Sequence, residues 1–464
     1  MTALLFVLFY FVVLLGLGFL AQKRTKKTPE DYFLAGRSFG PVILFFTLAA
    51  TNFSAFTFLG FAGAAYKFGF GQYGIMAVGT SLMPIMFYLV GRRIWSLGKE
   101  GGYITPPELI GKRLNSQLLR YMVLLVMVAF TIPYLAIQAV GAGLILNSIV
   151  GLEVALGASI TLIVISCYVL LGGMRGSGWT DLLQGVVMLL ALAGAVMFVS
   201  QGLGGFTSAG VKAFEANPSL FTRPGGNDYF TPSIWFSFML LWIFVDPMFP
   251  QLFSRFYTAK SEKSIKSAMV LYPILISFLF LCPVLIGVWA GGTDIQIDNA
   301  DLVLPEMVKI YAPYWVYIFV MVGALAALMS TADSQLLSLS TMLTHDLGFR
   351  KKEVTISRLM TVALTIFALA FLWFGFDPKA GIFGTLVKTT FSGLVVLFPT
   401  AFVALYRPKT SSIACVASIV VGEISIFLFR GGMLPTYGFL EGICALVVAT
   451  IVLVIGDKIL PEKI

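Results

Sequence analysis

The chain has 464 residues, of which 58% are hydrophobic and only 11% are charged, and its mean hydropathy is +0.93. This composition excludes a soluble globular protein and predicts a polytopic membrane protein. The net charge of +9 does not indicate a nucleic-acid partner, because the basic residues recur in short clusters between apolar segments and form no single patch.

Thirteen apolar segments have about the length that a membrane-spanning helix needs, which is roughly 20 residues. They fall near 3–21, 40–65, 72–96, 118–149, 152–172, 179–201, 233–255, 267–291, 314–343, 355–376, 380–405, 412–430 and 434–457. The first segment has neither a basic leader nor a convincing cleavage site, so we expect a retained helix. The sequence therefore predicts an all-α protein of the cell membrane, either the bacterial inner membrane or the plasma membrane.

Lys and Arg gather in alternate loops, including 23–27, 92–113, 255–266 and 350–352. By the positive-inside rule these loops face the cytoplasm, which places the N-terminus outside and the C-terminus inside. The longest loop, 201–232, is expected outside and holds a short helix or two. The loops leave no room for a soluble catalytic domain, so we expect no enzyme.

Two of the spans are locally hostile to a regular helix. The second is polar at its centre, over residues 48–57, and the seventh carries Pro247 and Pro250. The two segments are five spans apart and so cross the membrane in opposite senses. Interrupted helices at matching positions of two oppositely oriented halves are typical of inverted-repeat transporters. A simple proline kink in the seventh span, and tight helix packing in the second, are the alternative interpretations.

The ionisable and polar residues of the spans group at two depths. Three lie near the middle of their spans: Asn52, Asp246 and Ser330. Lys388 lies about 12 Å inside its span at the rise of an α-helix. Two carboxylates, Asp181 and Asp333, lie closer to the cytoplasm. An Asp at a helix centre costs roughly 2.5–3.5 kcal/mol on insertion scales, so such groups usually face a partner, an ion or a water-filled path.

The densest polar cluster is in the ninth span, where Ser330, Thr331, Asp333 and Ser334 lie within five residues. Hydroxyl and carboxylate oxygens suit a hard cation such as Na⁺. Close packing of helices is the alternative explanation, because Ser, Thr and Ala also let membrane helices approach.

Four motifs together resemble the sodium:solute symporter family, which includes bacterial sodium symporters for proline, pantothenate, sialic acid and galactose. They are 31–37 (DYFLAGR), 60–69 (GFAGAAYKFG), 172–184 (GGMR followed by WTDLLQ) and 327–336. The resemblance covers essentially the whole chain. It implies a core of five plus five inverted-repeat helices, with one helix before it and two after it.

The resemblance also implies the domain bounds. They are a peripheral N-terminal helix at 1–22, a first repeat at 38–202, an extracellular loop at 203–231, a second repeat at 232–406 and two peripheral helices at 407–464.

Carried over by motif, the sodium ligands are the carbonyls of Ala50, Phe53 and Ala327 and the hydroxyls of Ser330 and Thr331. A second cation, which some relatives hold, would lie nearer the cytoplasm at Asp181, Asp333 and Ser334. Asp333 stands where one type of relative has serine, which leaves the presence of this second site open.

The resemblance places solute contacts on the first, sixth and tenth core helices. The matching residues are Asn52, Ser54, Thr57, Trp242, Asp246, Lys388 and Thr389. Asp246 replaces an aromatic or apolar residue that is common in relatives, so the solute specificity of those relatives cannot be carried over to this chain. Asn52 could instead cap unwound backbone, Trp242 could serve packing alone, and Lys388 could pair with Asp246.

The favoured function is sodium-coupled import of a small organic solute by alternating access, with an amino acid or a small carboxylate as the favoured solute. The implied partners are Na⁺, the solute and the lipid bilayer, and a monomer suffices for transport. A channel would need a continuous polar stripe, which the sequence lacks. A proton-coupled carrier stays open because buried carboxylates can titrate. A transporter-like sensor is the remaining alternative, although the chain ends soon after its last span, so we expect no signalling domain.

Overall fold

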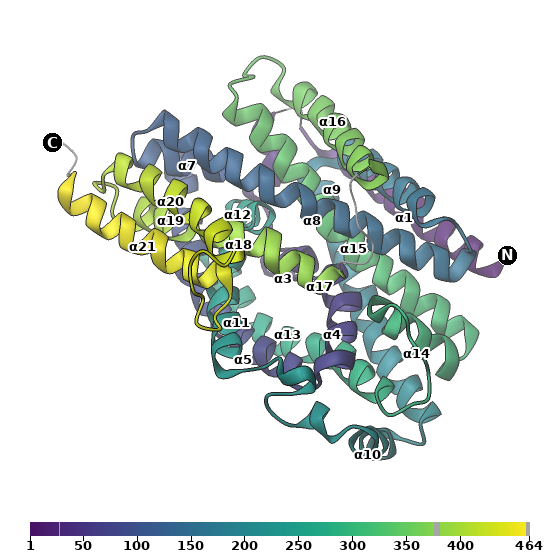
Figure 1. The fold of residues 1–464 in the computed structure, drawn as a ribbon. Coiled ribbons are helices and arrows are strands. Elements are labelled where there is room, and N and C mark those ends of the chain that lie inside the picture. Colours follow the sequence, from purple (N-terminus) through teal and green to yellow (C-terminus); the bar gives the residue numbers. More distant parts are fainter. Residues whose placement is uncertain (27, 375–380, 461–464) are drawn as a thin grey trace.

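Helices make up nearly all of the part of the chain that the structure, a computed structural model, describes: residues 1–26, 28–374 and 381–460 (Figure 1). In this part the only strand-like pairing is an isolated bridge between Phe39 and Ala259. The long helices are α1 (Thr2–Arg24), α8 (Gln117–Val150), α9 (Val154–Gly202), α13 (Glu262–Ala290), α15 (Tyr314–Asp346), α16 (Glu353–Phe374), α20 (Ser412–Arg430) and α21 (Glu441–Ile459).

Among the described residues, nine helices are long and apolar enough to cross a membrane, or eleven if each of two bent pairs counts as one span. The prediction of an all-α polytopic membrane protein is therefore confirmed. The number of thirteen spans and the bounds of the repeats stay predictions. The expected span ends at 376 and 380, Lys27 of the first basic cluster and the last four residues lie outside the described residues.

Both helices that the sequence marks as interrupted are bent in the structure. Helix α3 (Pro41–Asn52) meets the segment Phe56–Phe68, which comprises a short π-helical turn and α4 (Phe61–Phe68), at 60°. Helix α11 (Pro232–Val245) and the following turn meet α12 (Pro250–Tyr257) at 55°. Proline explains only the second bend, because it removes backbone donors there.

Helix α9 is 49 residues long, about twice the length that a bilayer needs, and it folds back on itself at Gly173. Tyr168 Oη donates to the carbonyl of Met329, and Thr180 Oγ1 donates to the Asp333 carboxylate. A continuous helix would separate Tyr168 and Thr180 by about 18 Å, yet their partners are only four residues apart on α15. The two halves correspond to the expected spans 152–172 and 179–201.

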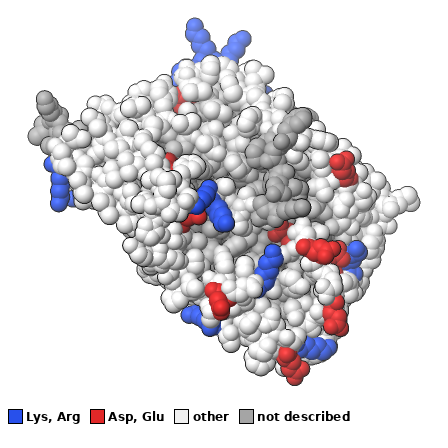
Figure 2. All heavy atoms as spheres, viewed as in Figure 1, with Lys and Arg blue, Asp and Glu red and all other residues white. Residues whose placement is uncertain are grey.

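Helix α15 lies at the centre of the bundle, between α8, α9 and α3 (Figure 1). Of its most apolar window, 89% is buried, whereas the corresponding value is 33% for α1 and for α21. The peripheral helices expose large apolar side chains instead, as lipid-facing helices do. Figure 2 shows one largely neutral face on which charged side chains occur singly or in small groups. The expected outer loop contains the short helix α10 (Phe206–Ala216).

Replacement of Gly173 by alanine should destabilise the protein. Gly173 has φ 53° and ψ −146°, a conformation that is nearly restricted to glycine, and an added Cβ would lie 2.6 Å from the Tyr32 carbonyl oxygen. We expect Gly173→Ala to cost about 2 kcal/mol or more and to lower the apparent melting temperature in detergent.

Gly194→Ala is the matched control, because Gly194 lies in the same helix and an added Cβ would meet nothing within 4 Å. It should leave the melting temperature unchanged or raise it slightly. Equal melting temperatures for both variants and the parent protein would contradict the proposed turn at Gly173.

Candidate functional site

The gap in the first broken helix faces the small and hydroxyl residues at the centre of α15. Ser330 Oγ lies 2.8 Å from the Ala50 carbonyl oxygen and 2.9 Å from that of Ala327. Thr331 Oγ1 lies 2.8 Å from the Phe53 carbonyl oxygen and 3.2 Å from that of Ala327. All five oxygen atoms predicted to bind sodium therefore gather in one place, and all five residues are buried.

The chemistry of this oxygen cluster fits a sodium ion. Every member is a neutral oxygen, the donor type that hard cations prefer. A bound ion would be coordinated by the same carbonyl oxygens that now accept hydrogen bonds from the Ser330 and Thr331 hydroxyls. The carbonyls of Ala50 and Phe53 are free for this role because the helix break releases them from regular helical bonding.

Side chains around the break satisfy the remaining backbone groups. The Ala55 N–H donates to Gln138 Oε1 of α8 at 2.8 Å, and the Phe56 N–H donates to Ser54 Oγ at 3.2 Å. Tyr134 Oη donates to Ser54 Oγ, and Thr57 Oγ1 accepts from the Ser54 N–H. The structure thus gives Ser54 and Thr57, both predicted to contact the solute, a role in holding the break. Gln138 and Tyr134 were not identified from the sequence.

Asn52 joins the two broken helices across the centre of the bundle. Its Nδ2 donates to Asp246 Oδ2 at 3.1 Å and to Tyr272 Oη at 2.8 Å. Asp246 is only 3% exposed, and it forms no ion pair with any described basic residue. Polar groups of both broken helices thus meet in one central region, while the predicted solute contacts of Asn52 and Asp246 stay a prediction.

An aromatic layer lies one helical turn further along the first broken helix. Phe56 stacks on Phe383 at a ring-centroid distance of 5.1 Å and contacts Trp242 and Phe391 edge-on. The indole Nε1 of Trp242 is buried without a hydrogen-bond partner among the described residues. Trp242 thus packs in this layer and also retains an unused donor.

On the far side of the aromatic layer is a cavity of about 260 Å³, lined by Gly60, Phe383, Lys67 and Lys388, among others. Lys388 is exposed here and forms no ion pair with Asp246, so a pairing between these two residues is absent from the structure. Its helix begins at Ile382, two residues after the predicted start of this span at 380, so the position of Lys388 along the span stays a prediction. Thr389 Oγ1 bonds to the Thr385 carbonyl of its own helix at 2.6 Å.

Asp301 also lines this outer cavity and lies outside the membrane-spanning helices. Burial raises the pKa of its carboxyl, while a hydrogen bond from the Ile382 N–H and the charge of Lys67 act in the opposite direction. Asp301 therefore ties the start of α17 (Ile382–Leu386) to the connection between α13 and α14 (Val303–Tyr311).

Arg255 lies between the residues expected to hold a second cation. Its Nη2 lies 3.1 Å from Asp181 Oδ2, 2.6 Å from Ser177 Oγ and 2.5 Å from Ser334 Oγ. Ser177 and Ser334 in turn donate to Asp333 at 2.8 Å and 2.9 Å. Arg255 and both carboxylates are completely buried.

Arg255 was expected at the end of the span 233–255, as the first residue of a cytoplasmic basic cluster, and its place in that cluster is wrong. Arg255 is part of α12, which continues to Tyr257 and is buried at every residue. Pro250 marked the start of this helix in the sequence, but no sequence signal gave the direction of the Arg255 side chain. Among the basic residues of the cluster 255–266, Arg255 is buried, whereas the lysines that follow it, such as Lys260 and Lys263, are exposed.

Backbone hydrogen bonds close the bundle below Arg255, at the end of the molecule that carries the Lys- and Arg-rich loops; we call this the basic end. The Phe39 N–H donates to the Thr258 carbonyl at 3.0 Å, and the Lys260 N–H donates back to the Phe39 carbonyl at 2.9 Å. Trp95 Nε1 donates to the Ala259 carbonyl at 2.8 Å. Backbone hydrogen bonds thus join the segment before α3 to the segment after α12. Asp246 therefore lies between this closure on one side and the aromatic layer on the other.

Comparison with known sequences identifies relatives over nearly the whole chain. A sequence model described as the sodium:solute symporter family matches residues 32–422. The sodium/pantothenate symporter of Escherichia coli (strain K12) is 25% identical over 461 residues, covering 97% of this chain and 95% of that protein. A high-affinity proline transporter of Bacillus subtilis (strain 168) is 27% identical over 444 residues, covering 91% of each.

Solved structures show the same fold. A Na⁺-coupled sialic acid symporter, in a substrate-bound outward-open state, superposes with a TM-score of 0.85 at 18% identity, covering 100% of this chain and 98% of that one. A nucleobase-cation-symport-1 family transporter superposes with a TM-score of 0.57 at 16% identity, covering 93% and 96%. These likenesses concern the fold and carry no residue assignments.

Proposed function

We propose that this chain, which belongs to the sodium:solute symporter family, binds its coupling ion between the break of α3 and the centre of α15. The protein is a sodium-coupled importer of a small solute and a multi-pass protein of the cell membrane. The observation that carries the ion site is the convergence of five buried oxygens from Ala50, Phe53, Ala327, Ser330 and Thr331.

The position of Asn52 supports direct coupling between ion and solute. Asn52 lies between Ala50 and Phe53, whose carbonyls are the proposed ion ligands, and its side chain bonds to Asp246. An ion that fixes these two carbonyls also fixes the direction of the Asn52 amide. Sodium and solute then bind more tightly together than alone, and by linkage the effect is reciprocal.

Loss of one sodium ligand should weaken sodium binding while the fold survives. In detergent, NaCl in place of choline chloride should raise the melting temperature of the parent protein, because a bound ion stabilises the folded state. Ser330→Ala and Thr331→Ala should each shift the sodium dependence to roughly tenfold higher concentration, about 1.4 kcal/mol.

Thr341→Ala is the control for this measurement. Thr341 is a buried hydroxyl residue of the same helix, and its Oγ1 bonds to the Leu337 carbonyl at 2.6 Å. It should keep the sodium dependence of the parent. An unchanged sodium response in both Ser330→Ala and Thr331→Ala would refute the site.

We propose further that the guanidinium of Arg255 is the cation between Asp181 and Asp333, in place of a second sodium ion. Two buried carboxylates need compensation, and Arg255 already bonds to Asp181 and, through Ser177 and Ser334, to Asp333. A cation tethered to the chain does not dissociate in the transport cycle. One sodium ion per solute is then the expected stoichiometry.

Equilibrium binding of radioactive ²²Na⁺ to the purified parent protein tests this proposal, and one ion per molecule is the expected result. Arg255→Met, combined with Asp181→Asn so that the net buried charge equals that of the parent, should still bind one ion. Arg255→Met alone should either bind a second ion or unfold at lower temperature. Two sodium ions bound by the parent protein would refute the role of Arg255.

The buried carboxylate of Asp246 supports a solute that carries an amino group. No described basic residue compensates its charge, and its hydrogen-bond donor is the neutral amide of Asn52. A protonated amine would supply the missing counter-charge. Lys67 and Lys388 at the outer cavity would attract a carboxylate as the solute approaches, so the charges along the path suit an amino acid.

A thermal-shift screen of amino acids, small carboxylates and sugars in NaCl tests the solute class. We expect stabilising compounds to carry an amine, and Asp246→Asn to reduce their affinity roughly tenfold or more. Lys388→Met should have a smaller effect, because Lys388 is exposed and far from the aromatic layer's inner side.

Glu423→Gln is the matched control, since Glu423 is a half-buried carboxylate of the peripheral helix α20. It should leave solute affinity unchanged. Stabilisation by a sugar, or by a carboxylate without an amine, that persists in Asp246→Asn would contradict the amino acid proposal. This result would not bear on the proposed sodium site.

A further inference from the structure

A cavity of about 530 Å³ lies at the basic end of the molecule, away from the transport site. It is enclosed by the end of α1, the short helix α2 (Pro29–Leu34), the turn of α9 and the start of α16. Its polar lining residues are Gln22, Thr25, Lys26, Tyr32, Arg350, Lys352, Glu353, Thr355 and Arg358. Four basic side chains thus face one carboxylate, which makes the cavity strongly positive.

The single carboxylate is already bonded elsewhere. Glu353 Oε1 lies 2.5 Å from His345 Nδ1. Among the described residues, Lys26 and Lys352 form no ion pair, and the buried Nε of Arg358 has no hydrogen-bond partner. The Arg358 guanidinium lies over the Tyr32 ring, with Cζ 5.3 Å from the ring centroid. No described carboxylate forms an ion pair with any of these three side chains.

The start of α16 adds to this positive character. The helix begins at Glu353, and Glu353, Val354 and Thr355 of its first turn line the cavity. Backbone N–H groups at a helix N-terminus have no intrahelical partner and favour an anion. The helix is 22 residues long, so the partial charge at its start is fully developed.

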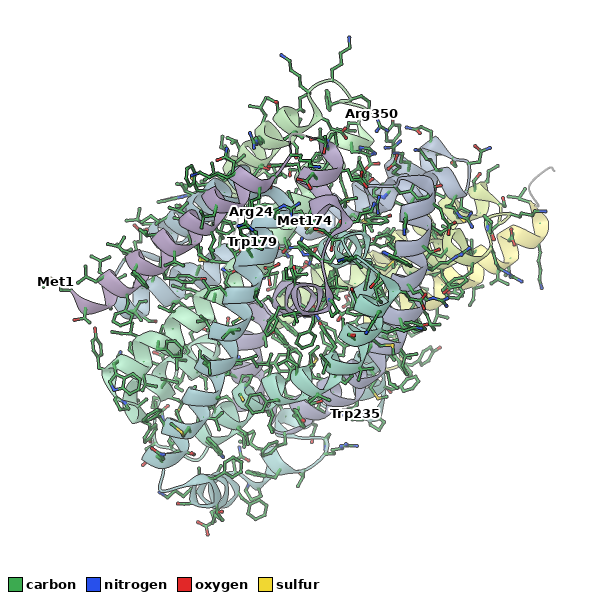
Figure 3. The ribbon with its side chains drawn as sticks, turned by 180° about the vertical axis from the view of Figure 1, so that it is seen from behind. Met1, Arg24, Met174, Trp179, Trp235 and Arg350 are labelled. Atoms are coloured by element: carbon green, nitrogen blue, oxygen red, sulfur yellow. The ribbon has the colours of Figure 1, made fainter. Side chains whose placement is uncertain are left out.

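The walls beside the cavity are apolar and face lipid. On α1, Phe19 and Leu20 are 49% and 52% exposed, one turn before Gln22. On α16, Leu359 is 63% exposed and directly follows Arg358. Figure 3 shows α1 running from Met1 toward Arg24, on the side of the molecule where Arg350 lies. The apolar surface of both helices leads from this basic end into the bilayer.

From this combination we propose that the cavity binds the headgroup of an anionic phospholipid of the cytoplasmic leaflet. The phosphate would lie among Lys26, Lys352, Arg358 and the start of α16, and the acyl chains would follow the exposed residues of α1 and α16. Basic pockets between helices on the cytoplasmic side suit such headgroups, because each nearby Lys or Arg strengthens binding. The apolar walls favour a lipid over a free phosphate ion.

Native mass spectrometry of the full-length, delipidated protein tests this site. Phosphatidylglycerol and phosphatidylcholine of equal chain length are titrated separately and in competition. We expect phosphatidylglycerol to bind at least roughly tenfold more tightly. The double variant Lys26→Gln with Lys352→Gln should lose roughly fivefold in affinity for each lysine removed. Arg358→Gln should lose a similar factor.

Lys260→Gln with Lys263→Gln is the matched control, because both lysines are exposed, belong to the same basic end and do not line the cavity. It should bind phosphatidylglycerol as the parent does. An equal loss in this control would show unspecific surface attraction and overturn the proposal. Displacement of phosphatidylglycerol by an equal concentration of inorganic phosphate would reveal a free-anion site and would also overturn it. Unchanged melting temperatures of the variants show that they are folded.

Discussion

The structure depends on one constraint, which is that a backbone unwound in the middle of a bilayer must find other hydrogen-bond or ion partners. The break after Asn52 frees carbonyls that hydrocarbon cannot solvate. Ser330 and Thr331 of α15 and Gln138 of α8 supply partners from two different helices. The break is therefore stable only where these helices meet. At the same point a cation of the right size can bind the carbonyl oxygens in place of the hydrogen bonds that the hydroxyls donate to them.

This arrangement links the ion to the rest of the transport path. Asn52 stands between two proposed ion ligands and reaches Asp246 on the second broken helix. The aromatic layer of Phe56, Phe383 and Trp242 begins one turn further along the same chain segment. A change in the ion site therefore reaches the proposed solute site and the outer aromatic layer through a single helix. The single positive charge of Arg255 stays bonded to Asp181, and is linked to Asp333 through Ser177 and Ser334, whether or not an ion is bound above it.

The sequence predicted the features that composition and proline determine. The spans, both broken helices and the oxygen-rich stretch at Ser330 follow from hydropathy, from Pro247 and Pro250, and from the clustering of hydroxyl residues. The family resemblance named the carbonyls of Ala50 and Phe53, which no side-chain pattern could reveal. Side-chain direction was not predictable, because a basic residue near a span end can turn outward, as Lys260 does, or inward, as Arg255 does. The same limit applies to Lys388, whose helix start was predicted to within two residues but whose side chain is exposed and not paired with Asp246.

Amide hydrogen exchange over residues 49–58, in NaCl and in choline chloride, tests the central claim most directly. If sodium binds the carbonyls at the break, it restrains the backbone there, and exchange should slow in NaCl for this segment while α21 is unaffected. In Thr331→Ala the same slowing should require a roughly tenfold higher NaCl concentration. Identical exchange of residues 49–58 in both salts, under conditions where sodium drives uptake, would contradict an ion site at the break of α3.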